Sequence, residues 1–289
     1  TSGLGGMSGA QPKAAKIAGI TSITAEVNQN AINKRFEQGW IDEIISDIDK
    51  LVERIKKLKI KNEISSIGYH GNIVEIWEEF NKRGIFIDIA SDQTSLHNPW
   101  SGGYYPISLS FKDSNKMIKK SPETFKKHVK KSLLRQVTAI NNHTKKGTYF
   151  FDYGNAFLLE SGRAKANIFQ KNGTYKYPSY VQDIMGPICF DYGFGPFRWV
   201  CTSNNKKDLK ITDQIAIDVL RKLQKKTSLD IKEQMEDNIN WIKSAQKNKL
   251  VVGSQARILY ANCEGRIEIA KAFNKAIKKK IIGPIILGR

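Results

Sequence analysis

A cluster of glycines stands near the start of the sequence, in front of a segment with helical character. Gly3, Gly5, Gly6 and Gly9 crowd together, and an acidic residue, Glu26, closes the next predicted strand. Glycines in such a turn let backbone N–H groups approach a pyrophosphate at the start of a helix. A carboxylate about 20 residues further on accepts hydrogen bonds from ribose hydroxyls. The third glycine comes one residue later than in G-x-G-x-x-G, so a dinucleotide site and a glycine-rich connection packed against a sheet both stay open.

The segments that must position these residues alternate between strand-like and helix-like patterns. Apolar and β-branched runs predict strands, and apolar residues three and four apart predict helices. Such alternation is typical of a parallel α/β sheet with helices on both faces. The first strand of such a unit would precede Thr1. The predicted strands are 20–27, 63–71, 85–91 and 148–154, and the predicted helices are 13–19, 40–59, 72–84, 114–140 and one starting near Asn155.

The pattern changes after about residue 162. Residues 170–203 are irregular, aromatic and rich in Gly and Pro, which is typical of a crossover into another domain. We therefore expect one domain at 1–180 and part of a second α/β domain at 181–289. The elements predicted for the second domain are helices at 211–226, 231–249 and 265–280 and strands at 256–261 and 281–288.

The formal net charge of +19 is the extreme feature of the composition. With ten Arg among the 47 basic residues, 37 are Lys (47 − 10), and most of these lie in amphipathic segments where they predict a solvated helix face. No recognisable nucleic-acid motif accompanies the charge, although a basic nucleic-acid-binding protein stays an alternative. No apolar run is long enough for a membrane helix. Cys189, Cys201 and Cys263 lack paired or zinc-type spacing, which predicts reduced thiols, no metal site and a cytoplasmic protein.

Seven short strings carry a resemblance to a known family. "TSGLGGMSGAQP", "HGN", "DQTSLHNP", "FDYGN", "GPFRW", "ARILYA" and "GPIILGR" occur in this order, with spacing similar to that of the urocanase (urocanate hydratase) family. The resemblance runs from the first residue to the last. It implies that this chain is a central segment that lacks N- and C-terminal parts of the family's chain. Because those parts complete the family's active site, we expect the segment alone to be inactive.

The resemblance implies a hydro-lyase of histidine degradation, a homodimer when complete, with a Rossmann-like NAD domain inserted into a larger core. Urocanases add water to urocanate and give 4-imidazolone-5-propionate. Their tightly bound NAD⁺ acts as an electrophile that the substrate's imidazole attacks, so no net hydride leaves with the product. An NAD-dependent dehydrogenase of unknown substrate stays the alternative, because the residues themselves indicate only a dinucleotide-binding α/β domain.

The family's site residues fall on matching positions of this sequence. Arg198, in "GPFRW", matches the residue that grips the substrate's carboxylate, and no catalytic acid or base is assigned. Plainer roles stay open for several positions: a helix N-cap for Asn72, packing for Tyr153, core packing for the aromatics beside Arg198, and ordinary loop positions for His70 and His97. The implied NAD-binding residues are Gly6, Met7, Ser8, Glu26, Asn72, Ile73, Gln93, Thr94, Ser95, Leu96, His97, Tyr104, Tyr105 and Tyr153.

The sequence also departs from part of the family. Many bacterial members carry Cys where this chain has Leu259, and the same forms have Arg where this chain has Ala31. Other members, including the longer animal-type enzymes, are similar to this chain at "ARILY" and "KRFEQGW". This pattern indicates a different branch of the family. The role of the Cys is not transferred to Cys263, because a strand-to-helix turn is expected between the two positions.

Overall fold

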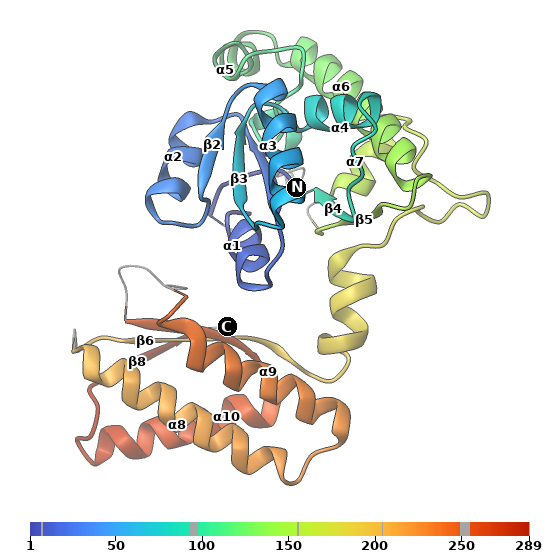
Figure 1. Ribbon diagram of the computed structural model, residues 1–289. Coiled ribbons are helices and arrows are strands. Elements are labelled where there is room, and N and C mark those ends of the chain that lie inside the picture. Colours follow the sequence, from blue (N-terminus) through green and yellow to red (C-terminus); the bar gives the residue numbers. More distant parts are fainter. Residues whose placement is uncertain (7, 93–97, 155, 204, 249–254, 289) are drawn as a thin grey trace. The chain divides into compact units, whose positions relative to one another are not determined.

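Two units, each with its own hydrophobic core, make up the chain (Figure 1). They span Thr1–Gln182 and Asp183–Arg289. The computed structural model describes residues 1–6, 8–92, 98–154, 156–203, 205–248 and 255–288. An irregular π-helix, η2 (Tyr180–Phe190), runs across the boundary between the two units.

The first unit alternates strands and helices along the chain, as the sequence predicts. Its elements are α1 (Ala10–Ile17), β1 (Ser22–Glu26), α2 (Gln29–Glu37), β2 (Glu43–Ile45), α3 (Ile48–Lys61), β3 (Ser66–His70), α4 (Ile73–Lys82), β4 (Ile89–Asp92), η1 (Pro99–Ser101), α5 (Phe111–Lys120), α6 (Pro122–Thr144), β5 (Tyr149–Asp152) and α7 (Phe157–Arg163).

The strands described in this unit pair in parallel. β1, β3 and β2 pair in the order β1-β3-β2, and β4 pairs with β5. The short segment at the start of the chain lies beside β1, where Gly3 N donates to Ala25 O at 2.8 Å and Ala25 N donates to Thr1 O at 3.1 Å. Parallel pairing places the carboxyl ends of the strands at one edge.

Helices cover both faces of the β1-β3-β2 sheet. Successive side chains of a strand point to opposite faces. Ile67 and Tyr69 of β3 belong to the main core, together with buried residues of α3 and α4. Gly68, between them, faces the other side, where a Cβ would lie 2.5 Å from Cδ1 of Ile41 and 3.0 Å from Ile32 of α2. The predicted α/β sheet with helices on both faces is confirmed.

The expected helix over 40–59 is wrong in its first third. Residues Glu43–Ile45 form strand β2, and α3 begins only after Asp47, whose side chain accepts from Lys50 N at 2.9 Å as an N-cap. The apolar pattern of this stretch fits a buried strand and a helix equally well. Helix α2 (Gln29–Glu37) was not predicted at all.

The expected Lys-rich helix over 114–140 is two helices. α5 ends at Lys120, and α6 begins at Pro122, which occupies the first helical turn. Proline there lacks the N–H that a continuing helix needs, and it disfavours helical angles at Ser121. Ser121 accordingly has φ −148° and ψ 63°.

In the residues described for the second unit, an antiparallel sheet packs with the α-helices α8, α9 and α10. The sheet order is β7-β6-β8, with β6 in the centre. Phe197, Trp199 and Leu259 are buried in the core, whereas Arg198 and Val200 of the same sheet are exposed. The helices therefore cover one face of the sheet (Figure 1). The bounds are β6 (Gly195–Cys201), α8 (Lys206–Gln224), α9 (Leu229–Ala245), β7 (Ala256–Ala261), α10 (Cys263–Lys278) and β8 (Ile285–Gly288).

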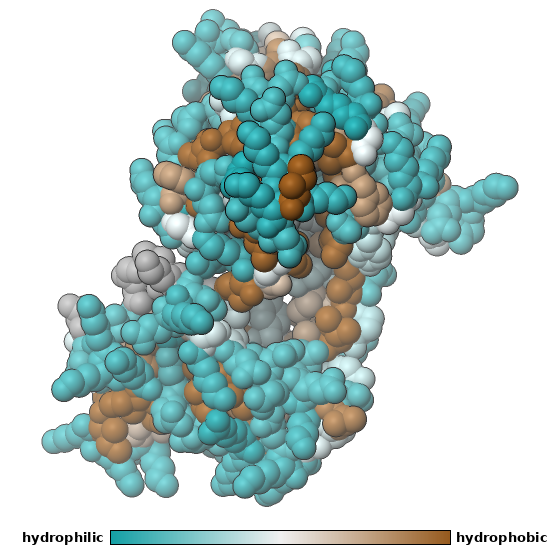
Figure 2. Space-filling view, in the orientation of Figure 1, coloured by the Kyte–Doolittle hydropathy of each residue, from teal (hydrophilic) through white to brown (hydrophobic). Residues whose placement is uncertain are grey.

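Hydrophilic residues cover most of the molecular face shown in Figure 2. Helix α6 shows how the lysines are arranged: Lys127, Lys130 and Lys131 are exposed, whereas Phe125 and Val129 of the same helix are buried. These lysines occupy a solvated face, as the amphipathic pattern predicts. None of the helices described is both long and apolar enough to cross a membrane.

Candidate functional site

Among the described residues of the first unit, Glu26 and several other polar residues lie at the carboxyl ends of parallel strands. Glu26 ends β1 directly beside His70, which ends β3. Asp92 ends β4 beside Asp152, which ends β5. In open parallel sheets, ligands bind in the crevice outside this edge. The glycine turn reaches the same edge, because Glu26 contacts it directly.

The glycine turn leads directly into the start of α1. Gly3 has a φ of 90°, which only glycine adopts readily. Ser8 is buried, and its hydroxyl accepts a hydrogen bond from Gly5 N at 2.9 Å. Gly6 is exposed, and a Cβ placed there would meet nothing within 4 Å. The first N–H groups of a helix lack intrahelical acceptors, so the start of α1 adds donors to this turn.

Glu26 is held at the turn by both of its carboxylate oxygens. Oε2 accepts from Leu4 N at 2.7 Å, and Oε1 accepts from Asn28 N at 2.8 Å. The side chain is half-buried. An ionised carboxylate has about four acceptor positions, so two of them are in use and the group can still accept from a ligand hydroxyl. Its position matches the sequence expectation, although the two backbone contacts were not foreseen.

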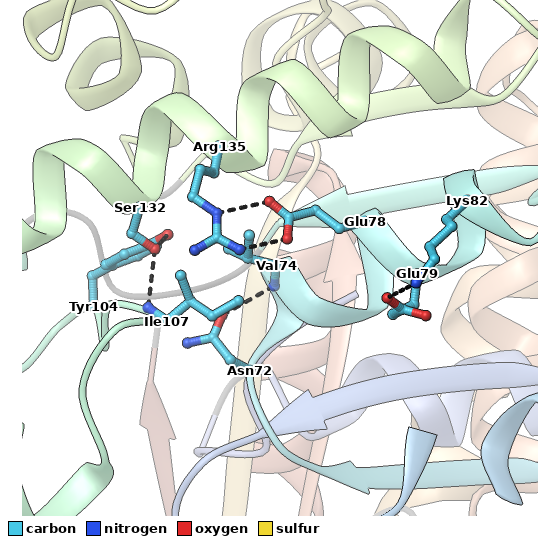
Figure 3. Close-up of polar contacts among 9 residues, drawn as sticks. All are labelled: Asn72, Val74, Glu78, Glu79, Lys82, Tyr104, Ile107, Ser132 and Arg135. Carbon is cyan, nitrogen blue, oxygen red and sulfur yellow. Dashed lines mark hydrogen bonds and ion pairs between the residues drawn. The ribbon is translucent and has the colours of Figure 1, made fainter. Parts of the chain in front are cut away.

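Asn72 caps helix α4 and joins it to the neighbouring loop. Its Oδ1 accepts from Val74 N at 3.0 Å (Figure 3), and its Nδ2 donates to Tyr105 O at 2.8 Å. The plain N-cap role that the sequence allowed is therefore present. Ile73, the next residue, is buried in the main core. Asn72 nevertheless lies at the carboxyl edge of the sheet, two residues after the end of β3.

Two adjacent tyrosines differ sharply in their surroundings. Tyr104 is 1% exposed, and its hydroxyl lies 2.9 Å from both Ser132 Oγ and Gln136 Oε1. Burial raises the pKa of Tyr104. Ser132 also accepts from Ile107 N at 3.2 Å (Figure 3), which ties this loop to α6. The Tyr104 side chain is thus buried in the core, and only the backbone of this residue can contact a cofactor.

Tyr105, by contrast, is half-buried beside the edge. Its hydroxyl donates to Asn115 Oδ1 at 3.1 Å, and its ring lies 4.9 Å from the Phe111 ring. Burial is the main cause that raises the pKa of Tyr105, and the negative charge of Glu26 acts in the same direction. Tyr105 thus feels the charge of Glu26, although the two residues are far apart in the sequence.

Tyr153 follows β5 at the same edge. Its ring stacks on Tyr180 with centroids 4.6 Å apart and an interplanar angle of 6°. The packing role that the sequence left open is therefore real, and the residue is half-buried. Six of the expected NAD contacts lie outside the described residues: Met7 and the five residues Gln93–His97.

Arg198 stands in the middle strand of the second unit's sheet. Its Cα is paired with Ile258 of β7 and Gly288 of β8, and its side chain is exposed on the sheet face opposite the core. Gly288 carries no side chain that could cover it. The aromatic neighbours Phe197 and Trp199 are core residues of this unit, as one of the two sequence interpretations expected.

The Leu259 position, at which the resemblance leads us to expect Cys in many bacterial members, is buried. Leu259 is 2% exposed and faces the core, on the opposite side of the sheet from Arg198. β7 ends at Ala261, and Asn262 caps α10 by accepting from Gly265 N at 2.9 Å. The expected turn before Cys263 is thus present. In the described parts of the chain, no three His, Cys, Asp or Glu side chains come together to hold a metal ion.

Sequence reasoning missed two features of the site. Arg35 of α2 donates a hydrogen bond to the glycine turn. In the sequence it is only a charged residue, and its buried position on the helix becomes visible in the structure. The carboxylate of Asp92 is buried and accepts from Ser2 Oγ at 3.0 Å and from Gln136 Nε2 at 2.8 Å. The hydrogen bonds of Asp92 thus join the start of the chain to β4 and α6.

Parallel strands with helices on both faces, and a glycine turn beside a strand-end carboxylate, define a Rossmann-like α/β protein. Two family models match the chain: one described as the urocanase Rossmann-like domain matches residues 1–184, and one described as the urocanase C-terminal domain matches residues 187–289. The chain belongs to the urocanase family.

Several relatives are about half identical to this chain. The chain is 51% identical over 297 residues to a probable urocanate hydratase of Dictyostelium discoideum. It is 50% identical over 297 residues to one of Caenorhabditis elegans and 49% identical over 299 residues to the urocanate hydratase of Mus musculus. Each comparison covers 100% of this chain and 44% of the relative. The chain therefore spans less than half the length of these relatives.

Proposed function

We propose that this chain supplies the NAD-binding part and a substrate-anchoring arginine of a urocanate hydratase. The observation that carries the proposal is the assembly of the glycine turn, the start of α1 and Glu26 at one strand edge, in a chain of the urocanase family. The first unit would be the NAD-binding domain, and the second unit would be part of the catalytic core domain.

The residues at the edge suit the separate parts of a dinucleotide. Gly6 is exposed, and a Cβ there would meet nothing, which suits close approach of a pyrophosphate; Met7 and Ser8 are the further phosphate contacts that the resemblance implies. Glu26 has acceptor capacity for the adenosine ribose hydroxyls. Asn72, Ile73 and Tyr105 would line the crevice beside it, with Gln93, Thr94, Ser95, Leu96, His97, Tyr104 and Tyr153 as further contacts.

Bound NAD⁺ would supply an electrophilic nicotinamide ring for the hydration of urocanate to 4-imidazolone-5-propionate. The chain's own part in this chemistry is to hold the reactants. Arg198 can grip the substrate's carboxylate with two parallel N–H···O bonds, which fix both distance and plane. Its exposed position on the open sheet face leaves the guanidinium accessible.

The setting that we propose is histidine degradation in the cytoplasm by a homodimer. The thiols of Cys189, Cys201 and Cys263 are all free, which suits a reducing compartment. The family resemblance supports the dimer and the pathway.

The test is the small-molecule content of the complete enzyme together with a urocanate absorbance assay on that enzyme, since the segment alone should not turn over urocanate. We expect stoichiometric NAD in the supernatant after denaturation, and loss of urocanate absorbance without accumulation of NADH. Release of NADH with a reduced substrate would instead favour the dehydrogenase alternative, and copurified RNA would favour the nucleic-acid alternative. Absence of both NAD and urocanate turnover would contradict the proposal.

A further inference from the structure

We propose that Arg35 is a positioning residue of the phosphate-binding turn, which its guanidinium holds by two backbone carbonyls. This inference rests on the proposed NAD site and deepens it. Arg35 belongs to α2, 8% of its surface is exposed, and it comes about 30 residues after the turn that it contacts. The role differs from that of Glu26, which bonds the turn from the end of β1.

The contacts of Arg35 engage the whole guanidinium. Nε donates to Leu4 O at 3.0 Å, and Nη2 donates to Gly5 O at 2.6 Å. Nη1 donates to Gln38 Oε1 at 2.5 Å, and the guanidinium carbon lies 4.7 Å from the centre of the Trp40 ring. A planar fork with donors at fixed angles can hold two successive carbonyls at once, whereas the point charge of Lys cannot.

Holding these carbonyls also orients the N–H groups of the turn. In a trans peptide the C=O and the following N–H point in opposite directions, and none of the described peptide bonds is cis. When Gly5 O points to Arg35, the N–H of Gly6 points away from Arg35, toward the exposed side of the turn. Arg35 therefore fixes the direction in which the turn presents a donor to a phosphate.

The contact with Arg35 accounts for a glycine at position 9, one residue later than in G-x-G-x-x-G. A Cβ on Gly9 would lie 2.5 Å from Arg35 Nε and 3.0 Å from Arg35 Cδ. Real Cβ atoms do not approach so closely, so the absence of a side chain at position 9 makes room for Arg35. The glycine and the arginine form one packing unit.

The charge of Arg35 has no acidic partner among the described residues. Its hydrogen-bond acceptors are two carbonyls and an amide, all neutral. Burial lowers the pKa of the guanidinium, but from so high a value that the group stays protonated. A buried cation without a carboxylate is costly, and an anionic pyrophosphate at the adjoining turn would supply the missing charge. The ligand chemistry that Arg35 favours is thus that of a nucleoside diphosphate group.

Ligand fragments separate this role from a structural one. In the full chain freed of nucleotide, we would measure the affinities of NAD, ADP and adenosine by calorimetry for Arg35→Lys and Arg35→Ala. We expect NAD and ADP to bind at least about tenfold more weakly to both variants, while adenosine changes less than about threefold. Arg54→Ala is the matched control, because Arg54 also contacts side-chain acceptors in this unit but lies on α3.

Two outcomes would overturn the role of Arg35. One is unchanged ADP affinity in both variants, and the other is an equal loss for ADP and adenosine, which would indicate general damage. If wild type itself bound no NAD or ADP, the proposed function would fail first, and the role of Arg35 would fail with it. Because Arg35→Ala can unfold, Arg35→Lys provides the measurement in a variant that keeps the charge.

A double-mutant cycle with Gly9 tests the packing unit directly. Gly9→Ala alone should weaken ADP binding by about tenfold or more, because its Cβ displaces Arg35 from the carbonyls. In the Arg35→Ala background the same change should cost clearly less, since the 2.5 Å clash with Arg35 Nε is gone and only the 3.0 Å contact with Gly5 O remains. Additive losses would show that the two residues act independently and would contradict the proposal.

Discussion

At the level of single residues, Glu26 has two roles, the proposed binding of the ribose and the hydrogen bonds to Leu4 N and Asn28 N, and one substitution affects both. Glu26→Ala removes a charged acceptor for the ribose, worth about 1.5–3 kcal/mol, so NAD affinity should fall by about tenfold to over a hundredfold. It also frees Leu4 N and Asn28 N, so the melting temperature should fall slightly. Calorimetric titration of apo protein and a thermal melt measure the two effects. Glu63→Ala, at an exposed residue, is the control, and unchanged NAD affinity in Glu26→Ala would remove Glu26 from the site.

Arg198 is the residue whose substitution should affect the substrate alone. In the complete enzyme, Arg198→Lys should lower kcat/KM for urocanate at least about tenfold, because it replaces a two-pronged hydrogen-bond donor with a point charge. NAD content and melting temperature should stay near wild type, since the side chain is exposed and lies outside the core. A parallel fall in stability and NAD content would show a structural clamp, and unchanged kinetics would exclude a substrate contact.

At the level of secondary-structure elements, Asn72 links the start of α4 to the Tyr105 loop through two different atoms. Asn72→Ala should cost about 0.5–2 kcal/mol of stability through the lost N-cap. Asn72→Asp keeps a good capping acceptor for Val74 N but lacks the Nδ2 donor to Tyr105 O. The Asp variant should therefore stay stable yet bind NAD more weakly. Chemical denaturation and NAD titration of both variants check this, and equal behaviour of the two would contradict it.

Helices α4 and α6 are joined by a buried histidine, and we expect it to make the first unit sensitive to acid. His143 of α6 is 1% exposed, its Nε2 lies 2.9 Å from Trp77 O, and burial is the main cause that lowers its pKa below the usual 6.5. The unfolded chain then binds a proton that the folded chain does not, so stability is full above about pH 6.5 and falls as the pH drops below it, by at most about 1.4 kcal/mol per pH unit. Denaturant unfolding between about pH 7.5 and 5.5 measures this. His143→Gln should flatten the profile, and the same loss in that variant as in wild type would assign the effect elsewhere.

The elements also show what the sequence can and cannot predict. The β-branched strands were correctly located, and the long amphipathic segments were correctly predicted as helical over most of their length, because their periodicity is strong. Strand β2 has three residues and no period of its own, and β6 begins with Gly195 and Pro196 inside an aromatic stretch, so both were missed. Helix α2 was missed because its buried face includes the charged residue Arg35. The place of Glu26 could be predicted from its spacing after the glycines. Arg35 instead bonds backbone carbonyls distant in sequence, and no sequence pattern indicates such a contact.

For the whole molecule, the two units hold different parts of the expected site. The glycine turn, Glu26, Asn72 and Tyr105 belong to the first unit, and Arg198 belongs to the second. The fold class and family follow from the pattern of elements and from matches that run along the whole chain. The individual NAD and substrate contacts stay predictions, and the variants described above address them one unit at a time.

The buried bond between Ser2 and Asp92 has a consequence for how the first unit folds. Ser2 and Asp92 are 90 residues apart, and the bond forms only when the segment beside β1 meets the end of β4. Closing so long a loop costs entropy before any contact offsets it, so contacts of this kind form late. The glycine turn continues directly from Ser2. We therefore expect its amides to gain protection from hydrogen exchange later in refolding than those of α4 or α6, so that the nucleotide site is among the last parts of the unit to become ordered.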